Sequence, residues 1–344
     1  MKKKINIMRL ILIPFSLFYS FFMSLRNFLY EMEILSICRS EAKVISVGNI
    51  TTGGTGKTPM IIFLAKYFLG KGKKVGIISR GYGRKTKEMV IVYDGKIFNR
   101  ETDQTGDELS LITFELLKDF SGNFFVAASD DRCTSAAFLT GNFNAEIILL
   151  DDAFQHRSIY RDLDIVMIDA NDMMLNGFLY KFTIPSGNLR ENLSGIKRAD
   201  LIIMNMKDSQ QTNPGFNFSS PALKIKYKTE YFIDHKNTIL NERKNKAVIF
   251  SGLAEPFSFR KAVEKNGIEV TGEIKFRDHH EYSEKDISEL ISLYKNDLIF
   301  ITTGKDFIKL RKFKDFIESY PVYYLNLEID ISDKEKLFFE NLLG

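Results

Sequence analysis

The sequence predicts an α/β fold in which a largely parallel sheet is flanked by helices. Two observations support this fold class: apolar runs rich in β-branched residues recur along the chain, and segments of helical spacing lie between many of them. Continuous apolar strands are typical of parallel sheets that helices cover on both faces. We interpret as strands Lys43–Val47, Val75–Ser79, Phe124–Ala128, Glu146–Leu150, Ile165–Ile168, Leu201–Met204, Ala247–Phe250 and Leu298–Thr302, and as helices Pro59–Leu69, Glu108–Leu117 and Phe257–Lys265.

The composition indicates a folded globular chain. Hydrophobic residues make up 44% of the 344 residues and charged residues 27%, as in ordinary globular proteins. The formal net charge of +4 is too small to indicate nucleic-acid binding, and we expect neither nucleic acid nor an obligate protein partner. The two cysteines, Cys38 and Cys133, lack metal-ligand spacing and imply no disulfide framework, which fits a reducing compartment.

Three parts are expected along the chain. Residues 1–32 form a membrane-interface helix, residues 33–215 form the core, and residues 216–344 form a second, smaller α/β lobe that closes a cleft. The polar segment Lys207–Pro221, rich in Asn, Gln, Ser and Pro, indicates the boundary between the two lobes. Within the core, residues 89–99 alternate around an Asp-Gly pair and predict a β-hairpin that projects from the sheet.

An uncharged, aromatic-rich stretch lies near the N-terminus. Leu10–Leu25 follows the lysines at positions 2–4, is shorter than the about 20 apolar residues that a spanning helix needs, and contains Pro14. Its three serines recur every fourth residue and so share one helical face. We interpret the stretch as a helix in the membrane interface, with the lysines, Arg9 and Arg26 on lipid headgroups. A membrane-spanning anchor and a buried core helix are the alternatives, and the lack of a small-residue cleavage site argues against a signal peptide.

The strongest motif is a glycine-rich turn between a predicted strand and a predicted helix. It follows Lys43–Val47 and consists of Thr51, Thr52, Gly53, Gly54, Thr55, Gly56, Lys57 and Thr58. In a phosphate loop of this pattern, backbone N–H groups surround phosphate oxygens, the lysine contacts the β- and γ-phosphates, and the last hydroxyl reaches magnesium. Thr51 departs from the pattern, which has glycine there. The turn therefore predicts a nucleotide site on a P-loop NTPase-like sheet, against the alternative of a plain glycine turn.

A pair of acids follows another predicted strand. Glu146–Leu150 ends in Asp151 and Asp152, and a buried strand that delivers acids at its carboxyl end is the magnesium-side element of P-loop enzymes. Acids also commonly end strands without any metal. Because the phosphate loop precedes them, we predict that Thr58, Asp151 and Asp152 hold Mg²⁺.

Four more polar clusters follow predicted strands or begin predicted helices, on the side where open α/β sheets bind ligands. They are Ser79–Arg84, Asp103–Glu108, Pro185–Glu191 and Phe276–His280. Arginines and an aromatic residue between glycines in the first cluster suit an anionic sugar. The second cluster is equally well explained as a helix N-cap with acids in the first turn. The paired histidines of the fourth would more often be solvated than catalytic.

Taken together, these motifs resemble the tetraacyldisaccharide 4'-kinase family of lipid A biosynthesis. The resemblance covers about residues 8 to 325, with the motifs in the family's order. It rests on Val47–Pro59, Ser79–Arg84, Gly106–Glu108, Asp151–His156, Ser186–Glu191, Asp278–His280, Thr303–Asp306 and the N-terminal apolar helix.

The resemblance implies an enzyme that phosphorylates the 4'-hydroxyl of a lipid A disaccharide 1-phosphate, with ATP as donor and Mg²⁺ as metal. It implies that Asp107 is the base and pairs with His279, and we expect Lys57 and Arg190 to neutralise phosphate charge. Substrate contacts are expected at Arg80, Tyr82, His156, Asn188 and Glu191. It further implies a peripheral or monotopic protein at the cytoplasmic face of the bacterial inner membrane, with the inner-leaflet surface as its partner.

Three positions depart from the family's pattern. Ala153 stands where we expect glycine, Leu109 where we expect proline and Gly304 where we expect glutamate. None removes a proposed catalytic group, although Gly304 leaves any role of that acid unfilled. Two other classes stay open. One is a membrane-associated P-loop ATPase or GTPase switch without a small-molecule acceptor, and the other is a soluble metabolite kinase, which would leave the N-terminal helix unexplained.

Overall fold

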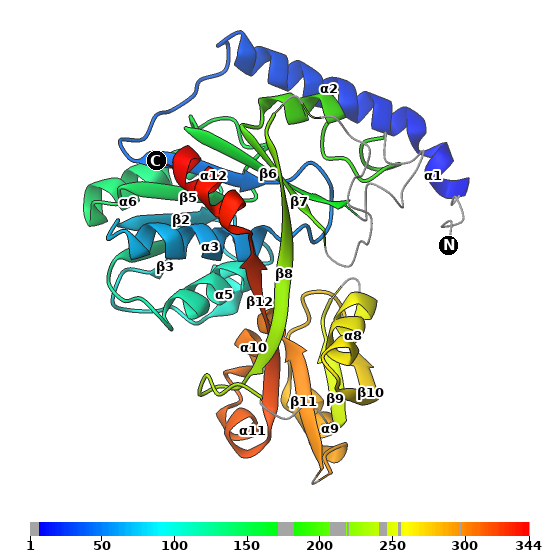
Figure 1. Cartoon of the computed structure of the whole chain (residues 1–344). Helices are drawn as coiled ribbons and strands as arrows, with labels where there is room; N and C mark the ends of the chain where they lie inside the picture. The colour runs from blue at the N-terminus through cyan, green and yellow to red at the C-terminus, as the bar shows by residue number, and fades with distance from the viewer. Residues whose placement is uncertain are drawn as a thin grey trace.

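The computed structural model describes residues 7–170, 182–206, 218, 220–240, 246–253, 256–295 and 297–343. These residues form a mixed α/β fold around one twelve-stranded, mainly parallel sheet (Figure 1), which confirms the predicted fold class. The lysines at positions 2–4 and most of the predicted boundary segment Lys207–Pro221 lie outside the described residues. The lobe boundary at residue 215 therefore stays a prediction.

The N-terminal half of the sheet is almost entirely parallel and is buried on both faces. Its parallel strands are β1 (Lys43–Gly48), β2 (Val75–Ser79), β4 (Phe124–Ala128), β5 (Ile147–Asp151), β6 (Leu163–Asp169) and β7 (Leu201–Asn205). The helical elements of this half are α3 (Lys57–Gly70), α4 (Thr102–Thr105), α5 (Asp107–Leu116), α6 (Arg132–Phe143) and the 3₁₀ helix η2 (Leu193–Arg198). Continuous apolar strands suit this half because helices bury both of its faces.

Two long strands carry the sheet into the C-terminal half. Strand β8 (Ala222–Ile233) pairs in parallel with β7 and antiparallel with β12 (Val322–Asp330), as Figure 1 shows. The remaining elements are β9 (Lys246–Ser251), β10 (Glu269–Lys275), β11 (Leu298–Thr303), α8 (Pro256–Lys265), α9 (Glu284–Ser292), α10 (Gly304–Leu310) and α11 (Lys314–Ser319). With edge strand β3 (Val90–Tyr93), the order is β10-β9-β11-β12-β8-β7-β6-β1-β5-β2-β4-β3.

The C-terminal half has its own hydrophobic core, but the end of the chain leaves it. Phe250, Phe300 and Phe307 belong to a cluster separate from the core of the N-terminal half. The last helix, α12 (Asp333–Leu343), packs Phe339 and Leu343 into the core of the N-terminal half instead. The chain therefore crosses between the halves twice, through β8 and back through β12.

The predicted projecting hairpin at residues 89–99 is wrong in its position. Val90 and Ile91 pair antiparallel with β4, so β3 is the edge strand of the main sheet. A tight turn then returns the chain to a single bridge between Tyr93 and Phe98. The reason is packing: Tyr93 is buried, and its ring lies 4.5 Å from that of Phe124, centroid to centroid. Burial of these side chains holds the strand against the sheet.

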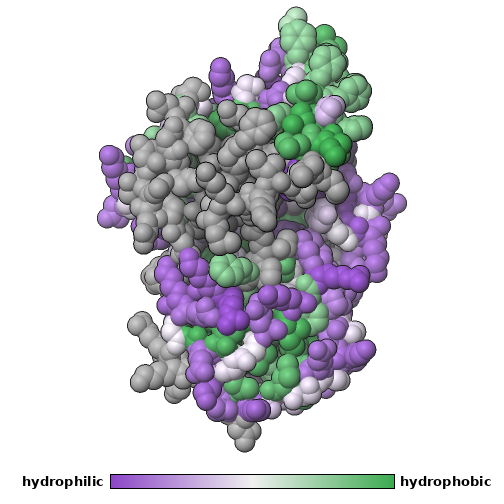
Figure 2. All heavy atoms as spheres, turned by 90° about the vertical axis from the view of Figure 1, so that its right-hand side faces the viewer, coloured by the Kyte–Doolittle hydropathy of each residue, from purple (hydrophilic) through white to green (hydrophobic). Residues whose placement is uncertain are grey.

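The N-terminal stretch is helical, as expected, and lies along the outside of the N-terminal half (Figure 1). It forms α1 (Ile7–Ile11) and α2 (Ile13–Glu31). Ser16 is buried against the body of the protein, whereas the helix exposes Phe15, Leu17, Phe18, Phe21, Phe22, Leu25 and Phe28. Figure 2 shows hydrophobic side chains gathered at the top of the molecule, where α2 lies in Figure 1. None of the described helices combines the length and the hydropathy needed to cross a membrane.

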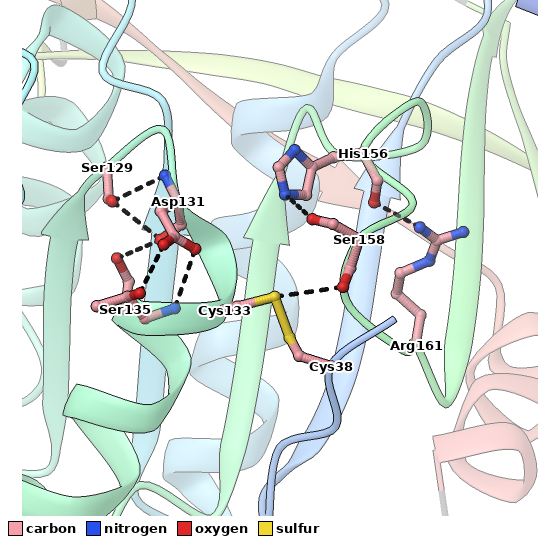
Figure 3. The surroundings of a disulfide bond; sticks show 9 residues. Cys38, Ser129, Asp131, Cys133, Ser135, His156, Ser158 and Arg161 are labelled. Carbon is pink, nitrogen blue, oxygen red and sulfur yellow. Dashed lines mark hydrogen bonds between the residues drawn. A yellow bond between two sulfur atoms is a disulfide. The ribbon is translucent and has the colours of Figure 1, made fainter. Parts of the chain in front are cut away.

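The two cysteines are joined, contrary to our expectation that they imply no disulfide. Cys38 and Cys133 form a disulfide across 95 residues of sequence, between the segment that follows α2 and the first turn of α6 (Figure 3). Cys38 reaches this place because its backbone N–H donates to the carbonyl of Ser158, beside a parallel bridge to Ile159. Cysteine spacing along the sequence does not encode this proximity, so the count alone was no guide to the redox compartment.

Candidate active site

The glycine-rich turn joins β1 to α3, as predicted, and its shape depends on glycine. Gly53 and Gly56 have φ angles of 123° and 94°, which side-chain-bearing residues rarely adopt. A Cβ atom on Gly56 would also lie 1.6 Å from the hydroxyl of Tyr227. That hydroxyl instead donates a hydrogen bond of 3.0 Å to the carbonyl of Gly56. Strand β8 thereby supports the start of α3, where the phosphate loop and the helix N-terminus meet.

Thr51, which replaces the expected glycine, has a structural role. Only 4% of its surface is exposed, and it forms an antiparallel bridge with Leu189. The next residue, Thr52, donates its backbone N–H to the carbonyl of Asn188 over 2.8 Å. An extended backbone at this position has no need of glycine. The sequence-predicted residues of the 185–191 segment are thus fastened directly to the phosphate loop.

Asp152 gathers the two cations that we expected at the phosphates. Lys57 Nζ lies 3.4 Å from Oδ1 of Asp152, and Arg190 Nη1 lies 2.7 Å from the same oxygen. Burial alone would raise the pKa of Asp152, but the charges of Lys57 and Arg190 outweigh burial and lower it. The carboxylate therefore stays ionised at the end of β5, beside the lysine of the phosphate loop.

Asp151 is the more deeply buried of the two acids. Burial, and then the charge of Asp152, raise its pKa to about 6. Ser79 donates to Oδ2 over 3.1 Å, whereas Oδ1 is buried without a hydrogen-bond partner among the described residues. An orphaned carboxylate oxygen in this position fits a hard cation such as Mg²⁺. The described residues contain no group of three acid, histidine or cysteine side chains that could hold a metal without further ligands.

Asp107 and His279 lie in direct contact, although 172 positions separate them in sequence. Nδ1 of His279 is 2.9 Å from Oδ2 of Asp107, at the first residue of α5. Burial raises the pKa of Asp107, but hydrogen bonds from His279 and Lys309 more than offset it, so the pKa is lowered. The same hydrogen bond raises the pKa of His279 against the effect of its own burial. The pair therefore favours an ionised carboxylate beside an imidazolium.

The glycine-rich 79–84 loop reaches this acid–histidine pair. A Cβ atom on Gly106 would lie 2.8 Å from Cα of Gly81, so only glycine permits the two backbones to approach so closely. Tyr82, with 67% of its surface exposed, has its ring 5.0 Å from that of His279. Arg80 forms an ion pair of 3.2 Å with Asp130 at the surface. Tyr82 thus lies beside the acid–histidine pair, and the side chains of Tyr82 and Arg80 are both accessible to a ligand.

Two of the expected substrate contacts have other partners in the structure. Glu191 is only 1% exposed and accepts hydrogen bonds from Asn27, Gln155 and Arg198. Its carboxylate holds α2 and η2 to the core, and this geometry does not support a direct substrate contact. His156 Nε2 is 2.8 Å from the hydroxyl of Ser158, near the disulfide (Figure 3). Burial, and then nearby arginines, lower the pKa of His156 to about 4, so its ring is neutral.

Asn188 connects three parts of the site, but by its backbone as much as by its side chain. Its carbonyl accepts from Thr52, and its side-chain oxygen accepts from Arg9 over 3.4 Å.

The three positions that depart from the family's pattern each fit their surroundings. Ala153 and Leu109 are fully buried, and a Cβ atom on Gly304 would lie 3.1 Å from Leu111, so a larger residue there would have to displace that side chain.

Two lysines of α10, Lys305 and Lys309, belong to the site, although the sequence assigned neither of them a role. Nζ of Lys309 lies 2.7 Å from Oδ2 of Asp107, and Nζ of Lys305 contacts Glu108 at the next position of α5. The two lysines are one helical turn apart and therefore lie on one face of α10. Lys305 lies within the Thr303–Asp306 motif, and its i, i+4 spacing from Lys309 was the available signal. It acquires meaning only once α10 is known to pack on α5.

Fold and site together define a class: a P-loop phosphotransferase. A phosphate loop between strand and helix, acids at the end of the neighbouring strand and an ionised acid–histidine pair lie at the carboxyl-end side of one sheet. A family model described as tetraacyldisaccharide-1-P 4'-kinase matches residues 8–343. The chain belongs to this family.

Individual relatives agree with the family model over the whole chain. A tetraacyldisaccharide 4'-kinase of Aquifex aeolicus is 35% identical over 333 residues, which are 95% of this chain and 96% of the relative. One of Chlorobium phaeobacteroides is 31% identical and covers 95% of both chains. A crystal structure of the Aquifex aeolicus family member in complex with ATP superimposes with a TM-score of 0.80, at 32% identity and 98% coverage of both chains. The family predicted from the motifs is therefore confirmed, and with it the kinase class.

Proposed function

We propose that this protein transfers the γ-phosphate of ATP to the 4'-hydroxyl of a lipid A disaccharide 1-phosphate at the cytoplasmic face of the bacterial inner membrane. The activity for which the relatives are named supports the reaction, and the Aquifex aeolicus complex supports ATP as the donor. The observation that carries the proposal is the contact between Asp107 and His279. The pair supplies a proton acceptor for a substrate hydroxyl. An NTPase switch, which hydrolyses its nucleotide with water, does not need an acid–histidine pair for an acceptor.

The donor side of the reaction depends on charge and position rather than on covalent chemistry. Backbone N–H groups of residues 51–58 and the N-terminus of α3 would surround the phosphates of ATP. Lys57 and Arg190, which converge on Asp152, would neutralise the charge that develops during transfer. Because one carboxylate oxygen of Asp152 holds both cations, the cost of organising the site for phosphate is lowered.

Magnesium fits the chain's own oxygen donors. The hydroxyl of Thr58 and the carboxylates of Asp151 and Asp152 would hold it, and the unpartnered Oδ1 of Asp151 supports this assignment. When bound, the ion would neutralise phosphate charge and orient the donor. Because the described residues alone do not complete a metal site, phosphate oxygens and water would supply the other ligands.

The acceptor side depends on Asp107. Its carboxylate would accept the proton of the sugar hydroxyl as the new P–O bond forms, and His279 would orient the carboxylate and hold its charge. Tyr82, exposed beside this pair, and Arg80, exposed two residues before it in the same loop, would contact the phosphorylated disaccharide. Arg80 suits the 1-phosphate because guanidinium groups bind phosphate oxygens in pairs.

The membrane surface would be met by α2. Its serine side is occupied by the protein: Ser186 donates its N–H to Ser16 over 2.8 Å, and Thr183 donates to the carbonyl of Ser16. Its aromatic side is exposed, which suits burial among acyl chains in the interface. The protein would thus be peripheral or monotopic, with its active site close to the embedded acyl chains of the acceptor.

An acceptor screen tests the proposal. Purified protein in detergent would receive γ-labelled ATP and Mg²⁺, with and without lipid A disaccharide 1-phosphate, and labelled lipid and free phosphate would be measured separately. Label should enter the lipid only when the acceptor is present. Release of free phosphate at the same rate with or without acceptor would favour an NTPase switch. Transfer to water-soluble sugars in preference to the lipid would favour a soluble metabolite kinase.

A further inference from the structure

Lys309 is a buried cation to which the proposed mechanism assigns no role. Its side chain is 2% exposed, and Nζ lies 2.7 Å from Oδ2 of Asp107. The same ammonium donates to the carbonyl of His280 over 3.0 Å. A buried ammonium is costly unless it is paired and hydrogen-bonded, so the contact with Asp107 accounts for its burial.

Lys309 and His279 both bind the same oxygen of Asp107. Nδ1 of His279 is 2.9 Å and Nζ of Lys309 is 2.7 Å from Oδ2. Two donors on one carboxylate oxygen fix the rotation of the carboxyl group and leave Oδ1 as the oxygen to receive a proton. Lys309 thus helps to decide which oxygen of Asp107 acts as the acceptor.

The charged groups around Asp107 identify Lys309 as its buried counter-ion. His279 contacts Asp278 as well, with Nε2 and Oδ1 separated by 3.9 Å, and it loses its charge at high pH. The neighbouring acid Glu108 is paired with Lys305. Nζ of Lys309 is also 3.9 Å from Glu281, but that acid is more than half exposed and is shared with Lys312. Within the described part of the chain, Lys309 is therefore the buried lysine that faces Asp107 directly.

The element that carries Lys309 belongs to the C-terminal half. Helix α10 packs against α5, which begins at Asp107, and the 278–280 segment that carries His279 is held by the carbonyl contact to Lys309. One ammonium thereby connects Asp107 of the N-terminal half to the histidine loop of the C-terminal half. Any separation of the two halves would remove both donors from the carboxylate together.

We propose that Lys309 is a positioning residue for phosphoryl transfer, which keeps Asp107 ionised and oriented from the C-terminal half of the protein. This inference rests on the proposed function. The test compares Lys309→Met with wild type in acceptor phosphorylation, with kcat, KM for ATP and the pH dependence of kcat as readouts. Lys312→Met, whose side chain is more than half exposed and pairs with Glu281, is the matched control.

Loss of the cation should lower kcat by a factor of about 10 to 100, whereas KM for ATP should change less than about twofold, because Lys309 contacts no proposed nucleotide ligand. Without Lys309, the buried carboxylate of Asp107 is harder to ionise, so the acid limb of the kcat profile should move to higher pH by about one unit. Lys309→Arg keeps the charge and should keep the limb near its wild-type position. Lys312→Met should match wild type in all three readouts.

A double-mutant cycle separates positioning from simple stabilisation. In an Asp107→Asn background, Lys309→Met should cost little further activity, because its partner is already gone. A full additional loss in that background, or an unmoved acid limb in an active Lys309→Met enzyme, would overturn the inference. If Lys309→Met does not fold, as judged by its thermal transition, the same readouts are measured on Lys309→Gln. A displaced acid limb of the kcat profile in Lys309→Arg would also overturn the inference. Wild type that transfers no phosphate to the acceptor would instead reject the proposed function.

Discussion

Arg190 Nη1 lies 2.7 Å from Oδ1 of Asp152, the oxygen that Lys57 also contacts. The same arginine accepts a hydrogen bond at its backbone carbonyl from Tyr19 of α2 over 3.0 Å. One residue thus connects the exposed apolar helix to the acid at the end of β5. The segment that docks α2 and the arginine that we expect at the phosphates are consequently the same piece of chain.

Lys57→Ala should reduce turnover by a factor of about 10² or more. The ammonium sits at the start of α3, and charge-stabilising groups in such sites contribute several kcal/mol in the transition state. Steady-state phosphorylation of the lipid acceptor measures the effect. Lys66→Ala, on the exposed side of the same helix and paired with Asp119, serves as the control. Wild-type turnover in Lys57→Ala would discard this lysine as the phosphate clamp.

Asp107→Ala and His279→Ala should each lower kcat by a factor of about 10² to 10⁴, the range of positioned general bases. Because the two side chains form one hydrogen-bonded unit, the double variant should lose little more than either single variant. KM for ATP should change little. Asp103→Ala, on the neighbouring α4, is the control for local disturbance. If the two defects simply multiplied, Asp107 and His279 would not act as a unit.

The stability of the protein should depend on pH through His279. Its pKa is raised in the folded state by the hydrogen bond with Asp107, so this contribution is fully present below about pH 6.5 and is lost as pH rises through the raised value. The melting temperature of wild type should therefore exceed that of His279→Ala by more at about pH 6 than at about pH 9. In an Asp107→Asn background, the difference in melting temperature caused by His279→Ala should no longer become smaller as the pH rises. A gap that widened toward alkaline pH would have the wrong sign for this ion pair.

Asp151→Asn should raise the Mg²⁺ concentration needed for half-maximal rate by about tenfold or more, because it removes a charged oxygen from the expected metal ligands. Titration of the initial rate with Mg²⁺ at saturating ATP measures this. Asp119→Asn, an acid exposed at the surface, should leave the titration unchanged. An unaltered Mg²⁺ dependence in Asp151→Asn would assign the unpartnered Oδ1 to some other role.

Replacing the outward aromatics of α2 should weaken membrane binding without harming the active site. Phe18→Ser and Phe22→Ser remove side chains that are 65% and 51% exposed, so the fold should tolerate them. Co-sedimentation with anionic phospholipid vesicles should fall by about tenfold for the double variant, since each aromatic buries apolar area in the interface. Binding of ATP should stay the same. The double variant Phe18→Leu and Phe22→Leu keeps the apolar face and should sediment like wild type. If the serine double variant also sedimented as much as wild type, this face of α2 would be excluded as the membrane contact.

The sequence alone was sufficient for those parts of the site that are local or that follow from a parallel sheet. Residues 51–58 form a phosphate loop because a strand, glycines with positive φ and a helix follow one another along the chain. Asp151 lies beside them because β1 and β5 are parallel neighbours, with Val47 opposite Asp151. Carboxyl ends of parallel strands meet at one edge of a sheet, so these neighbours could be expected from the order of strands and motifs.

Only the tertiary structure decided which distant residues meet. The contact of His279 and Lys309 with Asp107 depends on how β8 and β12 carry the sheet into the C-terminal half and place α10 on α5. The burial of Glu191 and the Cys38–Cys133 disulfide depend likewise on where the chain folds back. Hydrophobic periodicity determines which face of a strand or helix is buried, but it contains no information on which other element covers that face. That choice is made by the packing of the whole chain.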